Sequence, residues 1–220
     1  VHNNLGNALS AEGKNEEATS HYKMAIKLKP DYDEAHYNLG VTLVAEGNNE
    51  EAISHYKMAI KLKPDFADAY NNLGIALVAE GKNEEATSHY KMAIKLNPNY
   101  ANAYNNLGNA LLDKGRISEA ISHYKMAIKL KSDFAQPHYN LGNTLRREGK
   151  NSEAISHYKM AIKLKPDFAD AYNNLGNALL QKGELKEAID HYRETLKLRP
   201  DFVAAQKNLE IALLRSEELE

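Results

Sequence analysis

The stretch SHYKMAIKL occupies residues 20–28 and returns unchanged at 54–62, 88–96, 122–130 and 156–164. Each copy begins 34 residues after the one before it. A fixed period of this length indicates an array of repeats, each of which is one supersecondary unit. We therefore divide the chain into a partial repeat at 1–32, complete repeats at 33–66, 67–100, 101–134, 135–168 and 169–202, and a terminal segment at 203–220.

Two amphipathic helices fit into each repeat. In the repeat at 67–100, apolar side chains recur at the spacing of one helical face in two segments, first Tyr70, Leu73 and Leu77, then Ala86, Tyr90 and Ala93. Gly81 lies between the segments and suits a helix C-cap in the left-handed conformation. Pro98 marks the end of the second helix. The pattern predicts an all-α protein made of helix pairs.

All twelve glycines lie at the eighth or the fifteenth position of a repeat. The eighth position is inside the first helix, where glycine costs about 0.5–1 kcal/mol relative to alanine. Close packing of the two helices explains why the array accepts this cost. We expect each of these glycines to face a small residue of the second helix, as Gly74 would face Ala86.

These positions together resemble the tetratricopeptide repeat family. The resemblance rests on Tyr or His at the fourth position, Leu at the seventh, Gly at the eighth, Ala at the twentieth and twenty-seventh, Tyr at the twenty-fourth and Pro at the thirty-second, with Ser132 replacing the proline once. It covers the whole chain, although the occasional Trp of the family is absent. It implies a right-handed superhelical solenoid of six helix pairs plus a C-terminal capping helix, with the first helices lining a concave groove. Members usually bind peptides or protein segments.

The terminal segment at 203–220 departs from the repeat at one informative position, because Glu210 replaces the eighth-position glycine. A solenoid needs a polar outer face on its terminal repeat. Lys207, Glu210 and Arg215 supply such a face, so we expect this segment to cap the array. The N-terminal side has no equivalent cap, and Val1 falls at the third position of its repeat, so we expect further sequence before it.

Composition argues against several classes of function. The net charge of -2 and pI near 6.5 give no signature of nucleic-acid binding. The chain has no cysteine, and no apolar run reaches the roughly 18–20 residues of a membrane helix. We expect a cytoplasmic protein with no membrane partner.

The nine histidines do not form a metal-binding pattern. His21 and its equivalents occur once per repeat beside the core tyrosine, and the other three histidines stand at the fourth position. Copies one repeat apart cannot gather three or four zinc ligands at about 2 Å. No acid–base pair, phosphate-binding loop or Ser/His/Asp arrangement is present, so we predict no cofactor, no metal and no catalytic activity.

An asparagine holds the sixth position of every first helix although its neighbours vary. These residues are Asn4, Asn38, Asn72, Asn106, Asn140, Asn174 and Asn208. Asparagine is disfavoured in helices by several tenths of a kcal/mol, and this position is off the apolar stripe. We expect unpaired carboxamides along the groove that bond the backbone of an extended peptide. The row resembles that of the tetratricopeptide domain of O-linked N-acetylglucosamine transferases. Alternatively, the asparagines bond neighbouring first helices and stiffen the stack.

Residues at the fifth, ninth and twelfth positions change character along the chain. The second to fourth repeats carry an apolar strip made of Tyr37, Val41, Val44, Ile75, Val78 and Leu112. The later part is polar and basic, with ninth-position Asn109, Asn143 and Asn177 and with Arg146 and Arg147. The gradient suits a peptide with an apolar anchor followed by acidic or polar residues. Alternatively, the strip is stacking surface between first helices.

Three functions fit the sequence. The first is a non-catalytic module that binds extended peptides in its groove. The second is a structural scaffold that associates head to tail through the uncapped N-terminal face. The third is the substrate-recruiting arm of a larger glycosyltransferase-like enzyme.

Overall fold

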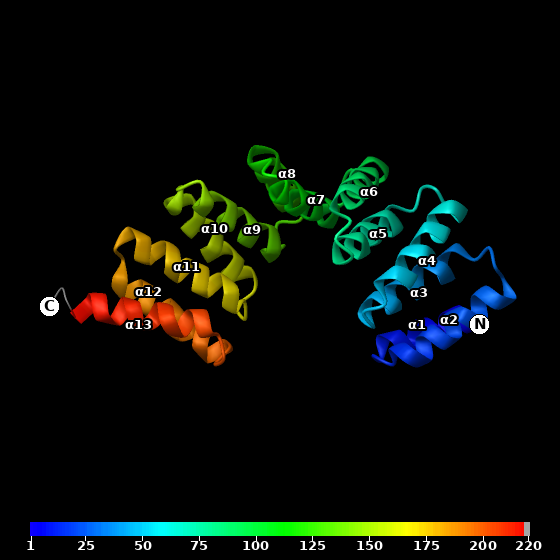
Figure 1. Cartoon of the computed structure of the whole chain (residues 1–220), viewed down its shortest axis with the longest axis horizontal. Coiled ribbons are helices and arrows are strands. Elements are labelled where there is room, and N and C mark those ends of the chain that lie inside the picture. Colours follow the sequence, from blue (N-terminus) through cyan, green and yellow to red (C-terminus); the bar gives the residue numbers. More distant parts are fainter. Residues whose placement is uncertain (218–220) are drawn as a thin grey trace. The chain divides into compact units, whose positions relative to one another are not determined.

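The computed structural model describes residues 1–217, which form thirteen α-helices and no strand (Figure 1). The helices are α1 (His2–Ala11), α2 (Asn15–Leu28), α3 (Asp33–Ala45), α4 (Asn49–Leu62), α5 (Ala67–Ala79), α6 (Asn83–Leu96), α7 (Ala101–Asp113), α8 (Ile117–Leu130), α9 (Ala135–Arg147), α10 (Asn151–Leu164), α11 (Ala169–Lys182), α12 (Leu185–Leu198) and α13 (Val203–Glu217). The predicted all-α class is confirmed.

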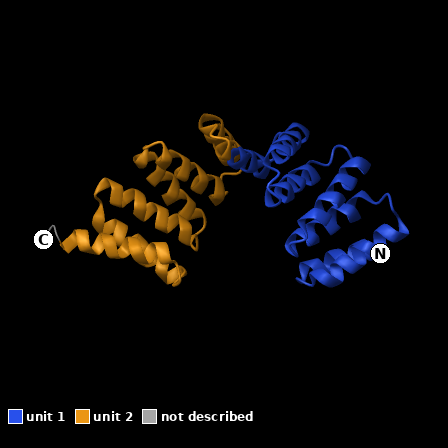
Figure 2. Ribbon diagram, in the orientation of Figure 1, with its two compact units in different colours: residues 1–110 blue, residues 111–220 orange. Residues whose placement is uncertain are grey.

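The chain forms two compact units, Val1–Ala110 and Leu111–Glu220, and α7 contains the boundary (Figure 2). Within each unit the helices pack in pairs: α1 on α2, α3 on α4, α5 on α6, α9 on α10 and α11 on α12. Each second helix also packs on the following first helix, as α4 does on α5 and α10 on α11. This is the predicted stacking of helix pairs, while the superhelical handedness of the whole array stays a prediction.

Successive first helices contact one another directly, as α3 contacts α5 and α9 contacts α11. Successive second helices are instead linked through long side chains, such as the ion pair between Lys23 Nζ and Glu51 Oε1 at 3.0 Å. The first helices are therefore the more closely spaced layer of each unit. Side chains on two neighbouring first helices are therefore close enough to contact each other across the boundary between repeats.

The turn inside each repeat depends on the fifteenth-position glycine. Gly81 has a φ of +71°, and its equivalents have φ between +71° and +81°. Only glycine adopts this left-handed conformation without steric cost. The next amide, Lys82 N–H, donates back to the carbonyl of Leu77 at 2.8 Å, which closes the C-terminal turn of α5. The predicted C-cap is confirmed.

The eighth-position glycine contacts an aromatic ring. A Cβ atom added to Gly74 would lie 2.5 Å from Cε1 of Tyr90, and the three nearest atoms all belong to that ring. Gly6, Gly40, Gly142 and Gly176 meet the equivalent tyrosines in the same way. The atoms nearest to these glycines therefore belong to the tyrosine of the second helix rather than to the alanine that the sequence pattern predicts.

Leucines at the seventh and eleventh positions form the core between the paired helices. They are at most 3% exposed in the five complete repeats: Leu39, Leu43, Leu73, Leu77, Leu107, Leu111, Leu141, Leu145, Leu175 and Leu179. The second-helix tyrosines Tyr56, Tyr124, Tyr158 and Tyr192 are also fully buried. A helix pair thus covers its first-helix leucines with its own second helix.

Candidate functional site

The sixth-position asparagines of the N-terminal unit take part in a chain of hydrogen bonds across three first helices. Asn106 Nδ2 of α7 donates to Asn71 Oδ1 of α5 at 3.0 Å. Asn71 Nδ2 donates to Asn72 Oδ1 at 3.1 Å. Asn72 Nδ2 then donates to the hydroxyl of Tyr37 on α3 at 3.0 Å. The sixth position of one repeat thus bonds to the fifth position of the repeat before it.

The C-terminal unit repeats this arrangement. Asn208 Nδ2 of α13 donates to Asn173 Oδ1 of α11 at 3.2 Å, and Asn173 Nδ2 donates to Asn174 Oδ1 at 3.2 Å. Asn174 Nδ2 donates to the Tyr139 hydroxyl of α9 at 3.2 Å. At the N-terminal end, Asn38 Nδ2 donates to Asn3 Oδ1 at 3.1 Å.

Most of the sixth-position carboxamides therefore have hydrogen-bond partners within the protein. The expectation of unpaired carboxamides is wrong for Asn38, Asn72, Asn106, Asn174 and Asn208, because the close spacing of first helices brings fifth- and ninth-position partners within reach. Asn140 is also buried and accepts from Gln136 Nε2 at 3.1 Å. Asn4 is exposed. The bonds match the alternative in which the asparagines link neighbouring first helices, and a role in peptide binding stays a prediction.

The ninth-position asparagines bond the core tyrosine of their own repeat. The hydroxyl of Tyr158 donates to Asn143 Oδ1 at 2.8 Å, and that of Tyr192 donates to Asn177 Oδ1 at 2.8 Å. Sequence reasoning placed Asn143 and Asn177 on the groove but missed the tyrosine. The spacing of fifteen residues that recurs between the two positions was the available signal. Asn109 holds the equivalent place on α7 and is exposed.

A small apolar pocket opens where the ninth position is not asparagine. Val41, Val44, Tyr56, Asn72 and Ile75 line a space of about 130 Å³ between α3 and α5. Val41 and Ile75 are 38% and 40% exposed, so the pocket presents aliphatic surface to solvent. Valine and isoleucine cannot accept a hydrogen bond from the tyrosine hydroxyl, so these repeats present apolar surface in place of the polar contact.

The structure brings only part of the predicted apolar strip into this pocket. Val78 is 42% exposed on α5 but is not among the pocket residues. Tyr37 is half-buried, and its ring packs on Phe66 with centroids 4.7 Å apart. Leu112 is half-buried on α7, on the C-terminal side of the unit boundary. Tyr37 thus packs on Phe66 instead of lining the pocket. The aliphatic lining comes from the ninth- and twelfth-position residues.

Two of the predicted polar residues of the later repeats, Asn143 and Arg146, interact with the hydroxyl of Tyr158. Burial raises the pKa of Tyr158 to about 12, and a hydrogen bond with Arg146 opposes that rise. Arg146 is half-buried, and its Nε atom has no hydrogen-bond partner among the described residues. Arg147 is exposed.

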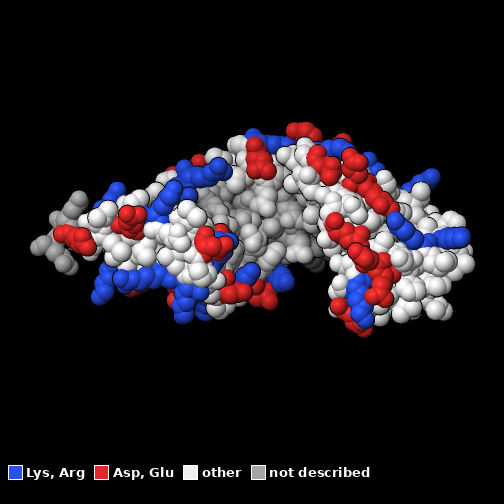
Figure 3. Space-filling view, turned by 60° about the horizontal axis from the view of Figure 1, so that its bottom comes forward, with Lys and Arg blue, Asp and Glu red and all other residues white. Residues whose placement is uncertain are grey.

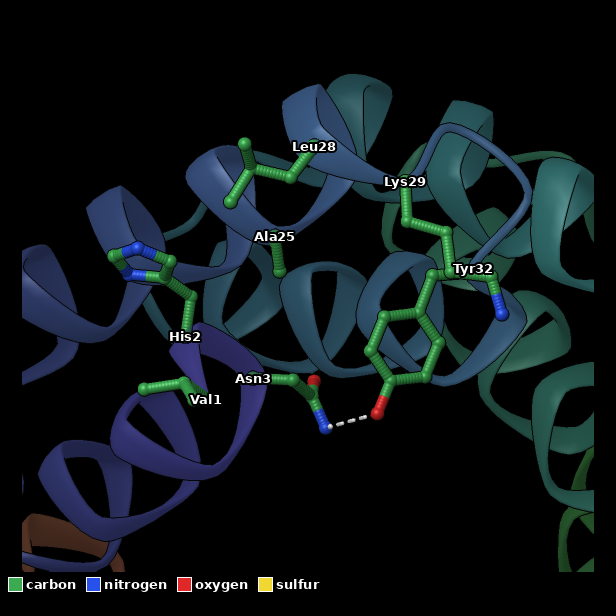
Figure 4. Close-up of a pocket in the computed structure, with 7 residues that line it drawn as sticks. All are labelled: Val1, His2, Asn3, Ala25, Leu28, Lys29 and Tyr32. Carbon is green, nitrogen blue, oxygen red and sulfur yellow. Dashed lines mark hydrogen bonds between the residues drawn. The ribbon is translucent and has the colours of Figure 1, made fainter.

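The N-terminal end of the first unit holds a second, mainly apolar pocket of about 280 Å³ (Figure 4). Its lining includes Val1, Ala25 and Leu28, and Asn3 Nδ2 donates to the Tyr32 hydroxyl at 3.3 Å across one side. Leu28 is 69% exposed, whereas its equivalent Leu62 in the next repeat is only partly exposed. This end of α2 presents apolar surface to solvent.

Both signs of charge are interspersed on the face drawn in Figure 3, where acidic side chains form a row over the N-terminal unit. Within residues 1–217, no group of three or more His, Asp or Glu side chains has the arrangement of a metal site. None of the described helices is long and apolar enough to cross a membrane.

The stacked helix pairs, the glycine–tyrosine contacts and the close first-helix layer define a tetratricopeptide repeat protein. The family described as the cilia and flagella-associated protein 70 C-terminal domain matches residues 1–215, and the chain belongs to this family. A comparison with curated proteins finds no match.

Solved structures share the fold. A chain of the APC/C hetero-tetramer Cut9–Hcn1 is similar with a TM-score of 0.85 and 23% identity, over 95% of this chain but only 42% of its own length. PilF of Pseudomonas aeruginosa has a TM-score of 0.83 and 20% identity, over 94% of both chains. YrrB, a TPR protein with an unusual peptide-binding site, has a TM-score of 0.65 and 22% identity, over 84% of this chain and 96% of its own.

Proposed function

We propose that this chain is a non-catalytic protein-interaction module that binds an extended peptide along its first helices. The observation that carries the proposal is the pocket between α3 and α5, where the exposed Val41 and Ile75 lie beside the carboxamide of Asn72. Membership of a tetratricopeptide repeat family agrees with an interaction role. The structural neighbour YrrB is also described by its peptide-binding site.

The size of the pocket favours a peptide side chain over a small molecule. Ligand sites for drug-sized molecules usually enclose roughly 300–1,000 Å³. A space of about 130 Å³ instead suits one aliphatic or other modest apolar side chain. Burying such a side chain against Val41, Val44 and Ile75 contributes about 1.5–3 kcal/mol.

Asn72 adds a polar contact at the rim of this pocket. A carboxamide has two N–H groups and an oxygen that accepts two hydrogen bonds. Its bonds with Asn71 and Tyr37 use one acceptor position and one donor position. The remaining acceptor is available to a peptide N–H next to the anchored side chain, which adds about 0.5–1.5 kcal/mol.

The C-terminal unit, considered by itself, carries side chains of a different chemistry. Asn143, Asn177, Arg146 and Arg147 provide amide and guanidinium groups on α9 and α11. These groups suit acidic or polar residues of the bound segment, as the sequence gradient predicts. The row of sixth-position asparagines then acts mainly by holding the first helices in register, with its unused hydrogen-bonding positions available to the peptide.

A peptide array probed with the whole chain tests the proposal. We expect enrichment of peptides with one aliphatic anchor followed by acidic residues. For the best peptide, Ile75→Asp weakens binding at least tenfold because it places a charge in the pocket, whereas Met58→Asp on the second-helix side leaves affinity unchanged. Met58 is a matched control because it is 37% exposed, close to the 40% of Ile75. Equal losses in both variants, or no peptide binding at all, would contradict the proposal.

Head-to-tail association, the second function, stays a prediction from the sequence, and the exposed Leu28 gives a position at which to test it. Sedimentation velocity at several concentrations measures it, and Leu28→Lys is expected to abolish any concentration dependence. If the sedimentation coefficient of Leu28→Lys still depends on protein concentration, the contact between copies lies elsewhere. The third function, a recruiting arm of a larger enzyme, stays a prediction from the asparagine row.

A further inference from the structure

In the C-terminal unit, the ninth-position asparagine of α9 connects two repeats. Asn143 Oδ1 accepts from the hydroxyl of Tyr158 on α10 at 2.8 Å and from Asn174 Nδ2 on α11 at 2.8 Å. A carboxamide oxygen accepts two hydrogen bonds, so these two donors occupy both of its positions. Tyr158 is fully buried, and the two bonds therefore tie α11 to the core of the preceding repeat. We call this pair of bonds the ninth-position bridge.

The ninth-position bridge recurs at Asn177 in the same unit and at Asn7 in the N-terminal unit. Each oxygen again accepts from the core tyrosine of its own repeat and from the sixth-position asparagine of the next repeat. The two distances are 2.8 and 2.9 Å at Asn177 and 2.9 and 3.0 Å at Asn7. Asparagine at the ninth position thus forms the same bridge in both units.

Between α3 and α5 the ninth position is Val41, which has no hydrogen-bond acceptor in its side chain. The side chains that correspond to the two donors of the bridge are Tyr56 and Asn72. Both line the apolar pocket of about 130 Å³ together with Val41. The pocket between α3 and α5 therefore lies at the place that the bridge occupies in the other repeats.

The bridge and a bound apolar side chain exclude each other. To enter the junction of α9 and α11, an aliphatic side chain of a ligand would have to separate Asn143 from both Tyr158 and Asn174. Polar groups that lose their partners inside a protein cost more free energy than the burial of one aliphatic side chain contributes. At Val41 no such bonds are broken, so burial of the side chain is not opposed.

We propose that the ninth-position residue decides whether the junction between two first helices accepts an apolar side chain of the bound peptide. This inference rests on the proposed peptide-binding function. Asparagine closes the junction through the bridge, whereas an aliphatic residue leaves a pocket. Val41 is then a specificity-determining residue, which assigns an aliphatic anchor of the peptide to the junction of α3 and α5. The junctions at Asn7, Asn143 and Asn177 do not take such an anchor.

A small branched alcohol tests the pocket without a peptide. The probe is isobutanol, whose isobutyl group is the side chain of leucine, titrated into the whole chain while NMR follows the methyl signals of Ile75. We expect shifts in the unchanged chain and in Val41→Ile, which keeps an aliphatic ninth position. Val41→Asn is expected to lose them, because its new amide oxygen accepts from Tyr56 and Asn72. Equal shifts in the unchanged chain and Val41→Asn would overturn the proposal.

A second change separates the bridge from the polarity of an added amide. Tyr56→Phe removes the hydroxyl donor, so the protein that carries both Val41→Asn and Tyr56→Phe cannot complete the bridge. We expect the isobutanol shifts at Ile75 to return in part. If they stay absent while circular dichroism shows an intact fold, the asparagine acts only through its polarity, and the proposed role of the bridge is wrong.

Transfer of the pocket to the C-terminal unit is the converse test. The double variant with Asn143→Val and Arg146→Val gives α9 the residues that α3 carries at Val41 and Val44. Isobutanol is expected to shift the side-chain amide signals of Asn174 in this variant. Arg146→Val alone keeps the bridge and is the matched control, in which we expect no shift. A folded double variant that behaves like its control would contradict the proposal.

The peptide array then relates the ninth position to peptide binding. We expect the affinity for peptides with an aliphatic anchor to fall about tenfold or more in Val41→Asn, which is the loss of one buried aliphatic side chain. Peptides that bind the unchanged chain and Val41→Asn with the same aliphatic preference would refute this inference but not the proposed function. If no peptide binds the unchanged chain, the proposed function fails, and the isobutanol titrations still decide whether the ninth position opens the pocket.

Discussion

Gly74 shows how one residue fixes the distance between the helices of a pair. Its missing side chain allows the ring of Tyr90 to lie against the backbone of α5, and Tyr90 is only 3% exposed. Any larger residue must push the second helix away or rotate the ring. The conformational cost of glycine in a helix, about 0.5–1 kcal/mol, is offset by burial of an aromatic ring.

We therefore predict that Gly74→Ala destabilises the protein although alanine is the better helix former. Overpacking costs about 1–3 kcal/mol, which exceeds the gain in helix propensity. Thermal denaturation followed by circular dichroism measures the effect. In a Tyr90→Leu background the same glycine change costs less, because the ring is no longer there. A Gly74→Ala protein more stable than the parent contradicts the role of the ring.

Histidine pairs link the two helices wherever the fourth position is histidine. His138 Nδ1 lies 3.1 Å from His157 Nδ1, and His36 Nδ1 lies 3.0 Å from His55 Nδ1. One nitrogen of each pair must donate and the other must accept, so the contact requires that at least one ring is neutral. Burial, reinforced by the neighbouring His157, lowers the pKa of His138 to about 4. Burial also lowers the pKa of His55 and of His157.

This geometry predicts a loss of stability in mild acid. The pKa of His138 is lower in the folded state than the roughly 6.5 of the unfolded chain, so the unfolded chain takes up protons first as the pH falls. The contribution is complete above pH 6.5 or so and is lost as the pH falls toward about 4. His138→Tyr introduces the residue found at Tyr70 and Tyr172. We expect its melting temperature to fall less between pH 7 and pH 4.5, by about 2–4 °C, with little change at pH 7. Parallel pH curves for the two proteins would exclude the effect.

At the scale of the helix, the sixth-position asparagines hold neighbouring first helices together. The relay from Asn106 through Asn71 and Asn72 ends on α3, so a single array of side chains spans α7, α5 and α3. Asn71 is only 3% exposed, and a buried carboxamide that loses its partner is costly. The relay therefore stabilises the spacing of the layer that the proposed peptide contacts.

Replacing a donor of this relay should cost stability. Asn106→Ala leaves the buried Asn71 oxygen without its bond, and we expect a loss of about 1 kcal/mol after the gain in helix propensity. Asn4→Ala is the matched control, because Asn4 holds the same repeat position but is exposed and makes no side-chain hydrogen bond with another described residue. Urea denaturation of both variants compares them. If the two variants are equally stable, the relay does not contribute.

Sequence periodicity predicts the helices and their turns because the seventh, eighth, fifteenth and twenty-fourth positions recur without exception in the complete repeats. It does not predict the partner of Asn72. The bond to Tyr37 joins residues 35 positions apart, and it depends on how far one first helix is shifted along its neighbour. The strip pattern predicts Val41, Val44 and Ile75 on exposed surface, where they line the pocket, but it does not predict that the ring of Tyr37 packs on Phe66.

At the scale of the whole chain, each repeat packs only on its neighbours. No packing contact between helices joins α1 or α2 to any described helix beyond α3. The stability of such an array is close to a sum of repeat and interface contributions. The similarity of the 67–100 and 101–134 segments means that α4 can pack on α7 as it packs on α5.

Deletion of residues 67–100 should therefore give a folded protein. We expect unchanged helicity per residue and a lower melting temperature, because one repeat and one interface are lost. Deletion of 67–83, half a repeat, is the control and should unfold the adjoining helices, since it joins two second helices in sequence. An unfolded protein from the full-repeat deletion would show that the repeat boundaries are wrong.

The contact between eighth-position glycine and second-helix tyrosine has a consequence for inheritance. Since both members recur with the same 34-residue period, a crossover between gene copies misaligned by whole repeats leaves one such glycine and one such tyrosine in every repeat. We therefore expect alleles with more or fewer whole repeats to encode proteins that fold, because the packing within each repeat is preserved.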